Sequence, residues 1–243
     1  MRKVAILAAG VGRRLQPLTN DRPKALLELG GRSLLELQLL SLAENGVPVS
    51  DVVVITGHKH ERLSACATRL GASVLLNPDF ESTNNIVSLH CLARTVGAED
   101  LDELLIVNCD IVAHPGIFRS LTLASQENAV VVDTTQPPSE EAMKVHIREG
   151  RVWRFGKTLE PALAQGEYIG LARLGADGVR GMFDVTAALV RAGDVDEWYE
   201  EGFNRIAEHV ELRPLDTRGL PWTEIDTPED YNRAQAIYQD FVS

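Results

Sequence analysis

The sequence predicts an α/β fold in which helices cover both faces of a mixed, mainly parallel central sheet, giving three α/β/α layers. Short apolar segments rich in β-branched residues alternate with helical segments through the first half of the chain. This alternation is typical of parallel strands joined by helices. The first apolar segment runs directly into a glycine loop, at the sheet edge where such folds bind ligands. Together these features indicate a Rossmann-like architecture.

Four strands are expected in the first half, each short, apolar and often β-branched. They span residues 3–8, 51–56, 72–76 and 103–109. Ser33 and Glu36 form a capping box that begins a leucine-rich helix, and Asn45-Gly46 ends it. Helices near 58–70 and 84–96 precede the third and fourth strands.

The second half is less regular. Strands are expected at residues 129–135, 143–148, 151–155, 167–174 and 211–215. Glu149-Gly150 has the residues of a hairpin turn between the second and third of these. Helices are expected near 176–192 and 196–208, and Thr227-Pro228 begins a final helix as an N-cap followed by proline.

Composition and charge exclude several classes of function. The 243 residues are 44% apolar, which suits a single globular domain. The net charge of −11 disfavours a nucleic-acid partner, and no apolar stretch approaches the ~20 residues of a membrane span. The three cysteines are scattered without metal-ligand spacing, so we expect reduced thiols and a cytoplasmic protein. The sequence does not indicate an oligomeric state.

The loop after the first strand has the residues of a phosphate-binding site. Leu7-Ala8-Ala9 ends the apolar run, and Gly10-Val11-Gly12 follows, so that backbone amides can face an anion. Arg13, Arg14 and Lys24 form a basic island in an acidic chain. A solvated surface loop is the alternative. A dinucleotide-binding loop would need glycine where Leu15 stands.

Two aspartates follow apolar runs and are candidate metal ligands. Asp110 ends the run 104–109, and Asp226 ends the shorter run 222–225. Both would emerge at the edge of the sheet where the phosphates are expected, and Mg²⁺ prefers one or two carboxylates together with phosphate oxygens. A turn or cap residue is the alternative for a single aspartate.

The segments Leu-Ala-Ala-Gly-x-Gly-x-Arg-Leu-x-Pro-Leu-Thr (7–19) and Pro-Lys-Ala-Leu-Leu (23–27) closely resemble the opening of the nucleotidyltransferases that make activated sugars and small activated phosphates. This resemblance implies the nucleotide-diphospho-sugar transferase fold, with a nucleotide-binding half at about 1–125 and an acceptor-binding half at about 126–243. It implies that the loop wraps the NTP, that Arg14 holds the pyrophosphate, and that Lys24 lies near the α-phosphate. It also implies that Asp110 and Asp226 bind Mg²⁺.

One departure from the resemblance concerns the residue two positions before Asp110. Some relatives carry Asp-x-Asp after the fourth strand, whereas the first position here is Asn108. The asparagine could support the metal site as a neutral ligand or through water.

The segment after the third strand bears on the choice of base. Sugar-specific relatives carry Gly-Thr-Ala there, whereas residues 77–89 of this chain resemble cytidylyltransferases acting on phosphocholine, inositol phosphate and aminoethylphosphonate. Asn84, Asn85 and Ser88 offer amide and hydroxyl groups that can pair with a pyrimidine edge, which favours CTP. Thr83 or Asn84 could instead serve only as a helix N-cap.

The acceptor residues are expected after Glu140. Lys144 and Lys157 suit an anionic acceptor, Glu167 or an acid near Asp196 suits an amino group, and Trp198 suits a pocket wall. Phosphocholine would need aromatic faces around its ammonium. Relatives specific for phosphocholine carry aromatics in the segment that corresponds to residues 141–145, whereas this chain has none there. The sequence shows no nucleophile–base pair. The second pKa of a phosphate is about 6, so the acceptor is already anionic at pH 7.

The function expected from these features is a Mg²⁺-dependent cytidylyltransferase that joins CMP from CTP to a small phosphonate or phosphomonoester and releases pyrophosphate. Aminoethylphosphonate, hydroxyethylphosphonate and phosphonoformate are the favoured acceptors. The alternatives are a phosphocholine or inositol-phosphate cytidylyltransferase, a sugar-1-phosphate nucleotidyltransferase using UTP or dTTP, and a non-catalytic nucleotide-binding regulatory protein.

Overall fold

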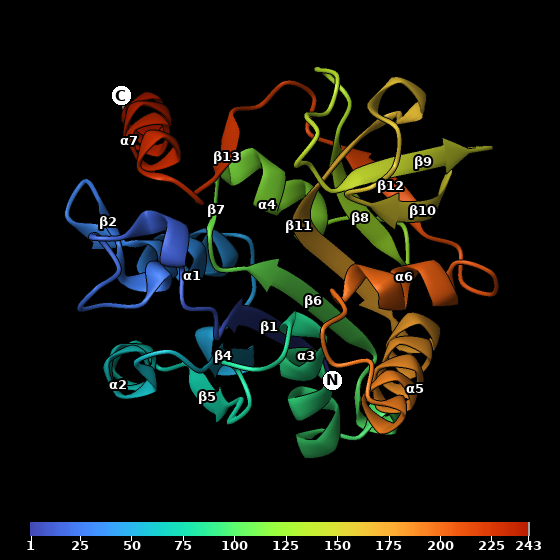
Figure 1. Ribbon diagram of the computed structural model, residues 1–243, viewed down its shortest axis with the longest axis horizontal. Helices are drawn as coiled ribbons and strands as arrows, with labels where there is room; N and C mark the ends of the chain where they lie inside the picture. The colour runs from blue at the N-terminus through green and yellow to red at the C-terminus, as the bar shows by residue number, and fades with distance from the viewer. Residues whose placement is uncertain (243) are drawn as a thin grey trace.

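A computed structural model describes residues 1–242, with side chains up to 239. Its centre is a mixed sheet that contains nine strands within this range (Figure 1). The first-half strands β1 (Arg2–Ala8), β4 (Val52–Thr56), β5 (Ser73–Leu76) and β6 (Glu103–Asn108) are parallel, in the order β6-β1-β4-β5. The four strands expected there are confirmed within one or two residues at each end.

Helices cover both faces of this sheet, so the three-layer prediction is confirmed. The elements on one face are α3 (Asn85–Thr95), α5 (Ala176–Ala192) and α6 (Glu200–Ile206). Those on the other are α1 (Leu34–Glu44), α2 (His60–Arg69) and α4 (Pro115–Thr122). Alternate residues of β1 supply the two cores: Ala5 and Leu7 pack on the first face, Val4 and Ile6 on the second. A strand segment buried on both faces has to be apolar, and β1 is apolar from Val4 to Ala8, where it is buried.

The second half joins the same sheet through β11 (Gly166–Gly175), which pairs antiparallel with β6. The hairpin of β9 (Lys144–Arg148) and β10 (Arg151–Gly156) lies beyond β11. Its turn residues Glu149 and Gly150 have φ of 53° and 73°, as the predicted two-residue turn requires. The strands β8 (Ala129–Asp133) and β12 (Arg213–Asp216) are parallel to each other, and β8 pairs with β11.

Several short elements were not expected from the sequence. They are α4, β2 (Glu28–Leu29), β3 (Arg32–Ser33) and β7 (Ile111–Ala113). The strand β7 pairs with β13 (Trp222–Glu224), and the last helix, α7 (Pro228–Val242), begins where it was predicted. The helix predicted at 196–208 is shorter and spans Glu200–Ile206. None of the described helices combines the length and apolar character needed to cross a membrane.

Candidate active site

A pocket of about 350 Å³ opens at the carboxyl ends of β1 and β6, where a parallel sheet is expected to bind its ligand. Residues from both halves of the chain line it. The lining includes every predicted site residue except two: Leu7, Ala8, Ala9, Gly10, Gly12, Arg13, Arg14, Lys24, Asn84, Asn85, Ser88, Asp110, Lys157, Trp198 and Asp226. The exceptions are Lys144 and Glu167.

The glycine loop at the end of β1 is held by its own neighbours. Gly12 has a φ of 65°, a left-handed conformation that favours glycine, and its carbonyl accepts a 2.9 Å hydrogen bond from Thr19 Oγ1. The backbone carbonyl of Ala9 accepts from the amide of His58 at 3.0 Å. A side chain at Gly10 would meet no atom within 4 Å, so this edge of the loop is open to a ligand.

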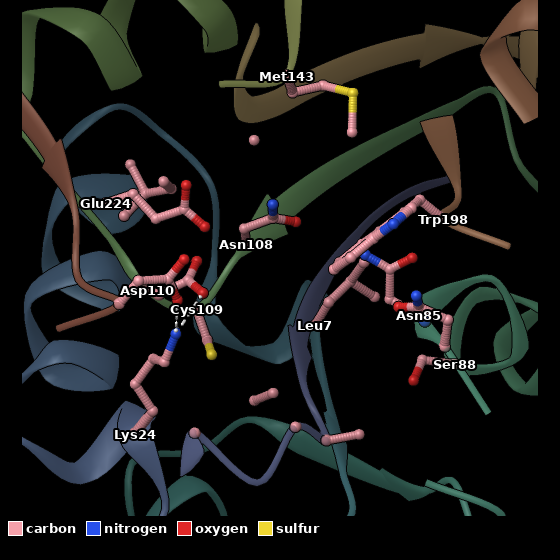
Figure 2. Close-up of a pocket in the computed structure, with 18 of the residues that line it drawn as sticks. Leu7, Lys24, Asn85, Ser88, Asn108, Cys109, Asp110, Met143, Trp198 and Glu224 are labelled. Atoms are coloured by element: carbon pink, nitrogen blue, oxygen red, sulfur yellow. Dashed lines mark hydrogen bonds and ion pairs between the residues drawn. The ribbon is translucent and has the colours of Figure 1, made fainter. Parts of the chain in front are cut away.

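A lysine and two aspartates from three distant segments meet in the pocket, and Figure 2 shows Lys24 and Asp110 of this group. Lys24 Nζ donates to Asp226 Oδ1 at 2.7 Å and to Asp110 Oδ2 at 3.0 Å. Arg14 pairs with the other oxygen of Asp226 at 2.6 Å. The two carboxylates raise the pKa of Lys24 strongly despite its burial, so the ammonium stays charged.

Glu224 completes a cluster of carboxylates that fits a divalent cation. One ligand oxygen each from Asp110, Glu224 and Asp226 lies within 4.8 Å of the others. Asp110 Oδ1 is buried and has no hydrogen-bond partner among the described residues. Burial and the negative charges of the two neighbouring aspartates raise the pKa of Glu224 to about 8. Carboxylate oxygens are hard ligands of the kind that suit Mg²⁺.

The last helix positions Asp226. Asp230 Oδ2 accepts hydrogen bonds from the backbone amides of Asp226 and Thr227, at 3.1 and 2.8 Å. The Thr227 hydroxyl donates to the same oxygen at 3.0 Å. The backbone amide of Ile225 donates to the carbonyl of Asp110 at 3.0 Å, which ties the two aspartates together.

The amide and hydroxyl groups predicted to read the base lie at the start of α3, across β1 from the carboxylates (Figure 2). Asn84 caps α3, and its side chain also donates to the carbonyl of Asp196 at 3.1 Å, so this amide is used within the fold. Asn85 Oδ1 accepts from the Tyr199 amide at 2.8 Å, which leaves its NH₂ for a ligand. Asn77 donates to Ser88 Oγ at 3.1 Å, and the hydroxyl proton of Ser88 remains available.

Charged and aromatic side chains also line the pocket near Asn85, beside which Figure 2 shows Trp198. Lys157 Nζ lies 4.9 Å from the ring centroid of Trp198, a cation–π contact. Glu200 also lines the pocket, is 5% exposed, and has a buried Oε2 without a hydrogen-bond partner among the described residues. Burial raises the pKa of Glu200 to about 7.

Lys144 does not line the pocket, whereas the sequence predicted it in the acceptor site. It is 1% exposed, and its Nζ donates to three backbone carbonyls, those of Glu140, Ala142 and Lys157, at 2.6, 3.3 and 2.6 Å. An ammonium has three protons, so the fold uses all of its donors. Glu167 lies on β11 outside the pocket lining, and burial raises its pKa to about 7.

Comparison with known proteins identifies the family. Residues 4–191 match the sequence profile of the MobA-like NTP transferase domain. The chain belongs to this family. A bifunctional IPC transferase and DIPP synthase of Rubrobacter xylanophilus is 29% identical over 96% of the chain, a match covering 51% of that protein. The chain thus spans about half the length of this relative.

A second NTP transferase relative, the CMP-5'-(3-aminopropyl)phosphonate synthase of Streptomyces rubellomurinus, is 34% identical over 56% of the chain and 21% of its own length. The fold is that of a solved CTP:phosphocholine cytidylyltransferase from Streptococcus pneumoniae. That structure has a TM-score of 0.81 and 21% identity, and the match covers 98% of this chain and 99% of the other.

The NTP transferase pocket contains residues that sequence reasoning missed. Glu224 stands two positions before Asp226 at the end of a strand, and this spacing could have placed both on one face. Glu200 stands four residues after Asp196, near which an acid was expected. Tyr168 and Gly170 also line the pocket, from β11.

Proposed function

We propose that this NTP transferase is a Mg²⁺-dependent cytidylyltransferase that transfers CMP from CTP to a small phosphonate or phosphomonoester. The observation that carries the proposal is that one pocket joins the Lys24–carboxylate cluster to Asn85 and Ser88. The relatives support it, because one is named a CMP-phosphonate synthase and another a choline-phosphate cytidylyltransferase.

In this proposal the triphosphate lies along the glycine loop. Backbone groups of Gly10 and Gly12 face its oxygens, and Arg14 neutralises the departing pyrophosphate. Asn85 and Ser88 read the cytosine edge with the donors that the fold leaves free. These two donors can pair with the acceptor atoms O2 and N3 of cytosine.

Asp110, Asp226 and Glu224 would hold Mg²⁺, which supplies neutralisation of phosphate charge when it is bound. Lys24 now bonds two of these carboxylates. With substrate present, its long side chain can turn towards the α-phosphate and leave the carboxylate oxygens to the metal.

The reaction is a displacement at the α-phosphorus. An anionic oxygen of the acceptor forms a bond to the α-phosphorus, and the bond to the bridging oxygen of the β-phosphate breaks, releasing pyrophosphate. The nucleophile is already deprotonated at pH 7, so no side chain has to accept a proton. Catalysis then rests on positioning and charge neutralisation, which the cluster supplies.

For the acceptor we propose a phosphonate or phosphomonoester that carries an amino group. Glu200 offers a buried carboxylate oxygen without a partner among the described residues, next to Trp198 and Lys157 in the lining. A buried carboxylate gains most from a cationic partner. Lys157 would receive the anionic end of the same molecule.

A pyrophosphate-release assay tests this function. Each of four NTPs is combined with Mg²⁺ and a panel of 2-aminoethylphosphonate, 2-hydroxyethylphosphonate, phosphonoformate, phosphocholine, inositol 1-phosphate and glucose 1-phosphate. We expect turnover with CTP and the aminophosphonate. Turnover with UTP or dTTP and the sugar phosphate alone would favour a sugar nucleotidyltransferase. Absence of turnover with CTP and every acceptor would reject the proposal.

A further inference from the structure

Asn108 stands in the middle of the pocket, between the carboxylate cluster and Trp198 (Figure 2). It ends β6 two positions before Asp110, where some relatives carry a second aspartate. The side chain is partly exposed, and it comes from the same strand end as a metal-ligand candidate.

Two buried tyrosines determine the orientation of the Asn108 amide. Tyr199 OH donates to Asn108 Oδ1 at 3.2 Å, and the hydroxyls of Tyr168 and Tyr199 lie 2.8 Å apart. Each phenol has a single proton. With the Tyr199 proton on Asn108 Oδ1, the Tyr168 hydroxyl is the donor to Tyr199, and the neighbouring Glu200 carboxylate is the competing acceptor of the Tyr199 proton. The tyrosines are 3% and 0% exposed, so water does not compete for these bonds.

The oxygen of Asn108 is therefore used within the protein, and its NH₂ is the free end. Among residues 1–239 no side chain or backbone group accepts a hydrogen bond from Nδ2. Gly170 makes room for this group, because a Cβ there would lie 2.6 Å from Nδ2. A free NH₂ donates hydrogen bonds and cannot coordinate a cation.

We propose that Asn108 is a specificity residue of the acceptor site, where its NH₂ donates to an anionic oxygen of the acceptor phosphonate or phosphate. This inference rests on the proposed function. Lys157, in the turn after β10, supplies a cationic partner and lines the same pocket. An aspartate at position 108 would turn a carboxylate oxygen towards that anion, and the repulsion would weaken acceptor binding.

Three variants test the inference. Asn108→Asp keeps the shape and the bond from Tyr199 but replaces the donor with a charge. Tyr199→Phe removes the hydroxyl that orients the amide. Tyr168→Phe removes a hydroxyl from the same buried pair but keeps the Tyr199–Asn108 bond, so it is the matched control. Thermal melting confirms that each variant is folded.

The acceptor KM and the CTP KM are measured with 2-aminoethylphosphonate. We expect Asn108→Asp to raise the acceptor KM about tenfold or more, with the CTP KM changed less than about twofold, because a hydrogen bond to a charged group is lost. Tyr199→Phe should raise the acceptor KM more than Tyr168→Phe does. An unchanged acceptor KM in Asn108→Asp, or a lower Mg²⁺ requirement in that variant, would overturn the inference.

Calorimetric titration of 2-aminoethylphosphonate onto the enzyme without CTP or metal separates this inference from the proposed function. The expected result is that wild type binds the phosphonate and Asn108→Asp binds it at least about tenfold more weakly. Equal binding by both proteins, or binding by neither, contradicts the role of Asn108. If wild type shows this binding difference but releases no pyrophosphate from CTP, the proposed cytidylyl transfer is rejected and the role of Asn108 in acceptor binding stands.

Discussion

Lys24 Nζ lies 2.7 Å from Oδ1 of Asp226, although the two residues are 202 positions apart in the chain. The lysine side chain is only 11% exposed, so its charge is largely removed from water. Burying an ammonium is costly unless carboxylates compensate it. Asp226 and Asp110 provide this compensation, and the contact joins Lys24, which follows the glycine loop, to the segment after β13.

Replacement of Lys24 should abolish most of the activity. In Lys24→Met, three acidic groups face one another without the cation, and the α-phosphate loses its partner. We expect kcat/KM for CTP to fall about 100-fold or more, measured by pyrophosphate release. Arg62→Met is the matched control, because Arg62 forms an exposed pair with Asp21 outside the pocket lining. A Lys24→Met enzyme as active as this control would contradict the role.

Glu200 should set the preference for an amino group. In Glu200→Gln the shape is kept and the charge is lost, so we expect kcat/KM for 2-aminoethylphosphonate to fall about tenfold or more. The value for 2-hydroxyethylphosphonate should stay the same or rise. The neighbouring Glu201→Gln is the control, since Glu201 pairs with Arg205 away from the pocket. An equal loss for both acceptors would show that the carboxylate does not recognise the amine.

Glu200 should also make the metal-free protein less stable as the pH rises. Burial raises the pKa of Glu200 from 4.5 to about 7 in the folded state. The folded state therefore holds this proton more tightly, and the stability gained from it is complete below pH 4.5. This contribution is lost as the pH rises through 7, which lowers the free energy of unfolding by at most about 3 kcal/mol. Urea unfolding in EDTA at pH 5 and pH 7.5 should show a smaller drop for Glu200→Gln than for wild type. An equal drop in the free energy of unfolding for wild type and Glu200→Gln would contradict the raised pKa of Glu200.

Lys144 should act on the acceptor site through the backbone. Lys144→Met leaves three carbonyls without their donor, and we expect a loss of ~2–4 kcal/mol in the free energy of unfolding. One of these carbonyls belongs to Lys157, so the acceptor KM should rise more than the CTP KM. Arg148→Met on the same strand is exposed and serves as the control. Stability equal to that of this control would refute the interpretation.

The sequence predicted the residues whose positions follow from a local sequence pattern, such as a continuous loop or the end of a strand. The glycine loop is continuous in sequence, and Asp110 and Asp226 follow strands, so topology brings them to one edge. Lys144 was misplaced because it begins a strand after an irregular segment, where alternation does not fix the direction of the side chain. The Tyr168–Tyr199–Asn108 chain depends on the pairing of β11 with β6 and on the placement of α6, which single-sequence patterns do not specify.

The product of the reaction gives the most direct test of cytidylyl transfer at the Lys24–carboxylate cluster. Wild-type enzyme, CTP, Mg²⁺ and 2-aminoethylphosphonate are followed by ³¹P NMR, with Asp110→Ala in parallel and melting curves to confirm its fold. We predict equal amounts of pyrophosphate and a CMP-phosphonate anhydride from wild type, and neither from Asp110→Ala. Wild-type rates in Asp110→Ala, or no CMP conjugate from CTP with any acceptor of the panel, would contradict the account.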